Sequence, residues 1–121
     1  MAKVFFDTNY LIHFKEISSL SIVDNFDKHN LCASTLSCHI YCYVNKIKVP
    51  DNVTSEIFKL FSLVNFTREI LYKALIGPTE DLEDNIQLHS AAEADCEYFL
   101  TSDEKLLNMK FFGKTRISKD L

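Results

Sequence analysis

Hydrophobic and polar residues follow two patterns along this chain, one of short apolar runs and one of helical spacing. The short runs are typical of buried strands. They predict strands at residues 3–6, 31–34, 97–101 and 114–117, with a shorter edge strand at 64–66. Between these runs, apolar residues recur at the spacing of one helix face. That spacing predicts helices at residues 10–16, 18–26, 35–48, 50–64, 67–74, 80–94 and 104–108.

Strands that alternate with helices predict a parallel sheet with helices on both faces. We therefore expect an α/β fold, a three-layer α/β/α sandwich around a central parallel sheet of four to five strands. The 121 residues are the size of one domain, and residues 1–121 contain no internal repeat or low-complexity tract. Hydrophobic residues make up 47% of the chain and charged residues 25%, as expected for a globular protein.

The net charge of −4 argues against a protein that holds nucleic acid mainly by neutralising phosphates. It does not argue against a nuclease, because carboxylates gathered at a metal site add negative charge that a bound cation reverses locally. The apolar run at residues 4–6 is too short for a signal peptide, and no run is long enough to cross a membrane. We expect a cytoplasmic protein whose four cysteines stay reduced and mostly buried.

Candidate chemistry lies at the ends of predicted strands. Asp7 directly follows the first strand, and Asp103 follows a later one. Sites in open parallel sheets form beyond the carboxyl ends of the strands. Asp81 and Asp84 lie one turn apart at the start of a predicted helix, so their carboxylates project from similar sides. Oxygen ligands gathered from distant segments suit a hard cation such as Mg²⁺ or Mn²⁺.

Each of these acids also has an ordinary structural explanation. An aspartate after a strand commonly caps the next helix, because its carboxylate accepts hydrogen bonds from the exposed amides of the first turn. The acidic residues at 80–84 likewise suit the positive end of a helix dipole. The combination of three acidic segments in one chain favours a shared site.

The segments that carry these acids resemble the motifs of PIN domains. The family's opening motif, a strand that delivers an Asp followed by small polar residues, resembles residues 4–12, VFFDTNYLI. Its second acidic helix is similar to residues 81–92, DLEDNIQLHSAA, and its final strand is similar to residues 96–103, CEYFLTSD. The order and spacing of the three motifs and the length of the chain fit the family over nearly the whole sequence.

The resemblance implies a PIN-like fold and a metal-dependent ribonuclease that cleaves single-stranded RNA. Its implied metal ligands, for Mg²⁺ or Mn²⁺, are Asp7, Asp84 and Asp103, with Asp81 as a nearby acid. The residues that would hold these carboxylates or a water are Asn9, Thr101 and Ser102. A short, stand-alone PIN domain resembles the VapC toxin of a VapBC-type toxin–antitoxin pair. This likeness implies a small antitoxin as partner and a homodimer.

One position departs from the family pattern. PIN domains usually carry a Glu on the helix after the second strand, and matching that helix places His39 there, with Cys38 adjacent if the register slips by one residue. His39 has three interpretations: a metal ligand or water-positioning group that favours Mn²⁺, a contact to RNA phosphate when protonated, or a structural replacement that weakens catalysis. Cys38, His39 and Cys42 are also zinc-ligand types, but no second pair with the usual spacing accompanies them.

Two other functional classes compete with a nuclease. One is a PIN-like module that binds RNA or protein without cutting it. The other is a phosphotransfer domain, but Asn9 stands where a phosphatase needs a second Asp, and Asp103 where a receiver domain needs a Lys. For a nuclease, the basic residues that are candidates to contact the substrate are Lys15, Lys46, Lys48, Lys105 and Arg116.

Overall fold

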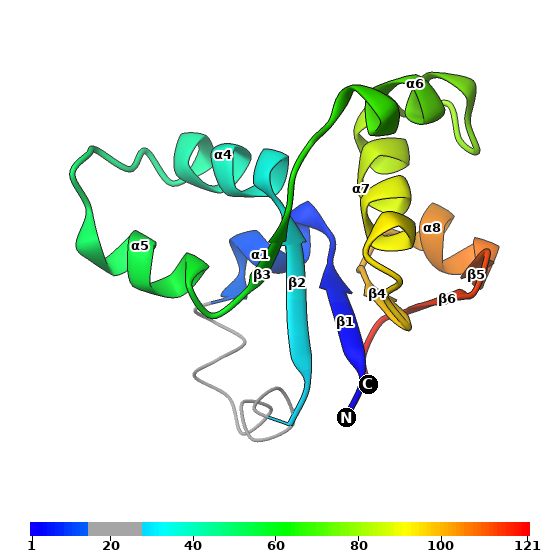
Figure 1. Cartoon of the computed structure of the whole chain (residues 1–121), viewed down its shortest axis with the longest axis horizontal. Helices are drawn as coiled ribbons and strands as arrows, with labels where there is room; N and C mark the ends of the chain where they lie inside the picture. Colours follow the sequence, from blue (N-terminus) through cyan, green and yellow to red (C-terminus); the bar gives the residue numbers. More distant parts are fainter. Residues whose placement is uncertain (15–27) are drawn as a thin grey trace.

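The computed structural model describes residues 1–14 and 28–121 of the chain. Within these ranges, six strands form one sheet in the order β3-β2-β1-β4-β6-β5 (Figure 1). They are β1 (Lys3–Phe6), β2 (Asn30–Ser34), β3 (Ser62–Val64), β4 (Tyr98–Leu100), β5 (Phe111–Phe112) and β6 (Thr115–Ser118). Neighbouring strands among β3, β2, β1, β4 and β6 pair in parallel. The short β5 pairs antiparallel with β6. The predicted fold class is confirmed, and β5 adds one antiparallel edge strand to the predicted sheet.

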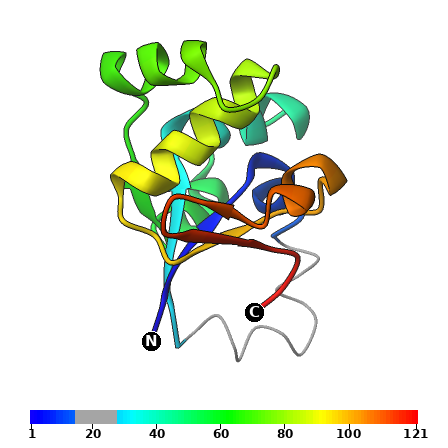
Figure 2. The ribbon, with the colours of Figure 1, turned by 90° about the vertical axis from the view of Figure 1, so that its right-hand side faces the viewer.

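Helices cover both faces of the sheet, as Figures 1 and 2 show. Those on one face are α1 (Thr8–Ile12), α4 (Thr35–Val44) and α5 (Asn52–Phe58). Those on the other side are α6 (Arg68–Ile76), α7 (Leu82–Glu93) and α8 (Glu104–Met109). No helix in the described ranges is long and apolar enough to cross a membrane.

The central strand β1 contributes to both hydrophobic layers. Val4 and Phe6 pack in the cluster beside α1 and α4, whereas Phe5 packs in the cluster beside α7. Phe5 also stacks on Phe99 of the neighbouring β4, with ring centroids 5.5 Å apart. A strand buried on both faces carries a continuous apolar run, which explains why this segment was predictable as a strand.

The predicted helix at residues 50–64 is wrong in its extent. The helix begins at Asn52, because the carboxylate of Asp51 accepts hydrogen bonds from the amides that open α5. It ends at Phe58, and the following Ser62–Val64 pairs with β2 as a strand. Strand pairing across the chain therefore overrides the helical spacing at the end of this segment.

The other helix boundaries shift less or cannot be compared. The helix predicted at 35–48 ends at Val44. The helix predicted at 18–26 and the candidate substrate contact Lys15 lie outside the described residues, and the predicted helix at 10–16 overlaps them.

The strand order places a switch point between β1 and β4. From β1 the next strands, β2 and β3, are added toward one edge of the sheet, whereas the strands after β4 are added toward the other edge. Open parallel sheets bind ligands in the crevice beyond the carboxyl ends of strands at such a point. Asp7 follows β1 and Asp103 lies just beyond β4, so the topology brings both to this edge.

Candidate active site

Asp7 is the most constrained acid at this edge of the sheet. Its side chain is only 5% exposed, and both carboxylate oxygens accept hydrogen bonds. Oδ1 accepts from the Thr8 amide at 2.8 Å, and Oδ2 accepts from the Thr101 hydroxyl at 2.7 Å. Burial raises the pKa of Asp7, the negative charges of Glu83 and Asp103 raise it further, and the two hydrogen bonds oppose the rise. The carboxylate is therefore held in one orientation.

Thr101 connects the two acids that follow strands. Its fully buried hydroxyl donates to Asp7 and accepts from the Asp103 amide at 3.1 Å. Asp103 in turn caps α8, its Oδ1 accepting from the Lys105 amide at 2.9 Å. One hydroxyl thus fixes the start of α8 relative to Asp7.

Asp84 brings a third carboxylate from the first turn of α7. Burial and then the negative charge of Asp81 are the main causes that raise its pKa to about 7. The charges of Asp7, Asp103 and Glu83 raise it further. An isolated aspartate has a pKa of about 4, so with a pKa of about 7 Asp84 is partly protonated at neutral pH. These acids form one interacting cluster although they come from three separate segments.

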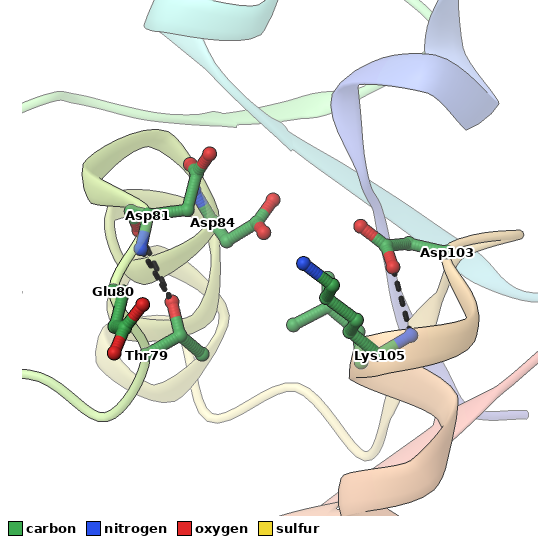
Figure 3. A pocket seen from close by; sticks show the side chains of 7 residues that line it. Thr79, Glu80, Asp81, Asp84, Asp103 and Lys105 are labelled. Carbon is green, nitrogen blue, oxygen red and sulfur yellow. Dashed lines mark hydrogen bonds between the residues drawn. The ribbon is translucent and has the colours of Figure 1, made fainter.

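The cluster borders a pocket of about 540 Å³. Its lining residues are Thr79, Glu80, Asp81, Asp84, Asp103, Lys105 and Leu106. Figure 3 shows Asp84 and Asp103 approaching from opposite sides, with the Lys105 amino group directed between them. Asp7 does not line this pocket, but Thr101 links it to Asp103 at the pocket edge.

The remaining predicted site residues have different positions. Asp81 is exposed and caps α7, its Oδ1 accepting from the Asp84 amide at 2.9 Å. Asn9 and Ser102 are exposed, and within the described ranges neither side chain hydrogen-bonds to an aspartate. His39 is exposed on α4 and lies outside the pocket lining, because the preceding Ser37 and Cys38 occupy the buried side of that helix.

Sequence reasoning missed a set of buried polar residues behind Asp7. Ser34, Ser37 and Gln87 are each fully buried and hydrogen-bond to one another. One signal was present in the sequence, since Gln87 follows Asp84 by three residues and so shares its side of the helix.

The donor atoms fit a hard divalent cation, because they are carboxylate oxygens with a hydroxyl beside them. In the described part of the chain, no three His, Cys, Asp or Glu side chains stand close enough together to hold a metal ion as they are. Like charges repel, so closer convergence of Asp7, Asp84 and Asp103 requires more positive charge than the Lys105 amino group supplies between Asp84 and Asp103. The donor chemistry suits Mg²⁺ or Mn²⁺.

Comparison with known proteins places the fold. No family model and no curated protein sequence matches this chain. Its structure is similar to a chain in the crystal structure of VapBC2 from Rickettsia felis bound to a DNA fragment from their promoter. The TM-score is 0.59 at 8% sequence identity, covering 96% of this chain and 97% of that chain. The likeness supports a PIN-like α/β/α fold and, at this identity, shows the fold alone.

Proposed function

We propose that this chain is a divalent-metal-dependent endoribonuclease that cleaves single-stranded RNA in the cytoplasm. The observation that carries the proposal is the gathering of Asp7, Asp84 and Asp103 near the switch point of the sheet, where the charges of Asp7 and Asp103 add to the rise in the pKa of Asp84. Perturbed carboxylates gathered beside a pocket are typical of functional sites.

The three aspartates would hold the metal through their carboxylate oxygens. Asp7 is oriented in advance by Thr8 and Thr101, so little side-chain freedom remains to be lost on binding. A bound divalent cation supplies an activated water and stabilises the charge that develops on the phosphate. A cation bound there would offset the repulsion between the Asp84 carboxylate and the other acids.

Metal-dependent cleavage by the full chain tests this proposal. Purified protein would be incubated with a pool of random single-stranded and hairpin RNAs in Mg²⁺, in Mn²⁺ or in EDTA. We expect cleavage with either metal and none in EDTA. Intact RNA under all three conditions would overturn the nuclease proposal.

A second candidate function is supported by the position of His39. The residue matched to the family's usual Glu is exposed and outside the pocket lining, so the described acidic set lacks this fourth position. A PIN-like module with this set would bind RNA or protein without cutting. Binding of the same RNA pool, measured by gel retardation with no cleavage in either metal, would favour this second function.

The structural neighbour supports a partner of a particular kind. That neighbour belongs to a VapBC2 complex on promoter DNA. We extend the proposal to a toxin role for this chain, with a small antitoxin as partner and a homodimer as its own assembly. Expression of the chain alone is expected to arrest bacterial growth, and co-expression of a small neighbouring reading frame to restore it. Growth unaffected by a catalytically active chain would contradict the toxin role.

Metal binding should depend on pH through Asp84. Its pKa is about 7, so below that pH the carboxyl is increasingly protonated and neutral and is a poor metal ligand. We expect the Kd for Mn²⁺ to rise roughly tenfold for each pH unit below about 7 and to level off above about 8. Calorimetric titration with Mn²⁺ across this range measures the slope. A Kd that stays constant through neutral pH would contradict the assignment of Asp84 as a ligand.

Lys105 is expected to contact an RNA phosphate at the pocket. It is the cation among the lining residues, and its amino group points between Asp84 and Asp103. Lys105→Ala should raise KM for RNA about tenfold and leave kcat nearly unchanged. The slope of log K against log salt concentration for RNA binding should become shallower by about one, as expected for the loss of one phosphate contact. The matched control is Lys114→Ala, which removes an exposed lysine outside this pocket. Equal KM values for the two variants would contradict this role.

A further inference from the structure

A buried polar network joins the middle of α7 to the ends of β2 and α4. Its centre is Gln87, which is fully buried. The side-chain oxygen Oε1 lies 3.0 Å from the Ser34 hydroxyl and 3.0 Å from the Ser37 hydroxyl. Both serines are also fully buried, and the Ser37 amide donates to the Ser34 hydroxyl at 2.9 Å. One side-chain oxygen thus ties the start of α4 to α7.

The same network continues to Asp7. The Ser37 hydroxyl lies 2.8 Å from the Thr8 hydroxyl, and the Thr8 amide donates to Oδ1 of Asp7 at 2.8 Å. With the Ser37 proton donated to Gln87, the Thr8 hydroxyl is the donor to Ser37. The path from Gln87 through Ser37 and Thr8 to Asp7 lies entirely in the interior, where hydrogen bonds are electrostatically stronger than in water.

The other end of the Gln87 amide has no matching partner. Nε2 is buried and makes no hydrogen bond with the described residues. A buried donor without an acceptor destabilises a fold, so an apolar side chain of similar size would satisfy packing at this position better. The contribution of Gln87 therefore lies in Oε1 and in what Oε1 holds.

We propose that Gln87 is a positioning residue for Asp7. It anchors Ser37, Ser37 anchors Thr8, and the Thr8 amide fixes one oxygen of the Asp7 carboxylate. The expected effect of Gln87 on metal affinity rests on the proposed nuclease function. Its expected effect on the orientation of Thr8 does not. Gln87 does not line the pocket, so its effect is transmitted through the network.

Two variants of Gln87 separate positioning from packing. Gln87→Met keeps the length of the side chain and removes the acceptor. Gln87→Glu, which burial keeps as the neutral acid, keeps an oxygen for both serines. The matched control is Ser90→Ala on the same helix, which removes another fully buried hydrogen bond, from the Ser90 hydroxyl to the Ile86 carbonyl, away from Asp7.

The measurements are hydrogen exchange of the Thr8 amide by NMR and the Kd for Mn²⁺ by calorimetry, both on the full chain. We expect Gln87→Met to speed Thr8 exchange at least about tenfold relative to the other amides of α1 and to weaken Mn²⁺ binding about tenfold. Gln87→Glu should restore both values to near wild type, and Ser90→Ala should change neither.

Unchanged Thr8 exchange and unchanged Mn²⁺ affinity in folded Gln87→Met would overturn the inference. If Gln87→Met does not fold, Ser37→Ala cuts the same path while leaving Gln87 in place, and its Thr8 exchange decides in the same way. If wild type binds neither Mn²⁺ nor Mg²⁺, the proposed function fails, and Thr8 exchange alone still decides whether Gln87 positions this turn.

Discussion

The Asp7→Asn variant should cleave RNA on the order of 1000-fold more slowly than wild type and bind Mn²⁺ at least about tenfold more weakly. Asn matches the shape of the aspartate, and its amide oxygen can still accept from the Thr8 amide. Its amide nitrogen, however, would replace the carboxylate oxygen that accepts from Thr101. The variant therefore loses one ligand charge while the surrounding turn is retained.

Rates would be measured by single-turnover cleavage in saturating Mn²⁺, and folding by circular dichroism. The matched control is Asp95→Asn, because Asp95 is exposed and has a φ of 55°, a left-handed conformation that Asn adopts readily. Asp95→Asn should retain wild-type activity. Cleavage by folded Asp7→Asn at the wild-type rate would exclude Asp7 from the reaction.

The edge of the sheet that holds the candidate site was predictable from the sequence. A buried strand carries a continuous apolar run, and parallel strands present their carboxyl ends at one edge. These two rules predict that Asp7 and Asp103 lie close together, and they use no information about long-range contacts. The acidic start of the predicted helix offers Asp81 and Asp84 alike, and the resemblance to PIN domains is what favours Asp84. Its raised pKa depends on charges that only the fold brings near.

Long-range pairing explains the features that sequence patterns could not predict. The end of α5 and the start of β3 are decided by pairing of Ser62 with Cys32 on β2, thirty residues earlier in the chain. Likewise, the partners of buried Gln87 are Ser34 and Ser37, which lie 53 and 50 residues away. Local periodicity contains no information about either contact.

The placement of His39 shows how sensitive a motif match is to register. One residue along a helix turns the side chain by about 100° around the axis. Ser37 and Cys38 occupy the buried side of α4, so His39 faces solvent. Aligning a helix by motif alone can therefore exchange a residue beside the site for one on the surface.

The Asp84→Asn variant should be more stable than wild type without metal and nearly inactive with it. The pKa of Asp84 lies at about 7 in the folded chain against 3.8 ordinarily, so its ionised form is disfavoured by folding. At about 1.4 kcal/mol for each pKa unit, this shift sets an upper bound of about 4.5 kcal/mol. Solvent screening of the partly exposed carboxylate, and loss of a favourable charge at the helix start, reduce the expected gain to about 1–2 kcal/mol.

The sign of this effect depends on pH. Because the folded pKa is raised, the destabilisation by ionised Asp84 is fully present above about pH 7 and disappears as pH falls toward about 4. Urea unfolding in EDTA should therefore show Asp84→Asn as more stable at about pH 8, with the difference shrinking toward zero as the pH falls to about 4 and below. Saturating Mn²⁺ should reverse the order, since the ion stabilises wild type by mass action and binds the variant weakly. If Asp84→Asn is instead less stable than wild type in EDTA at about pH 8, Asp84 is a structural helix-start residue rather than a carboxylate held for a cation.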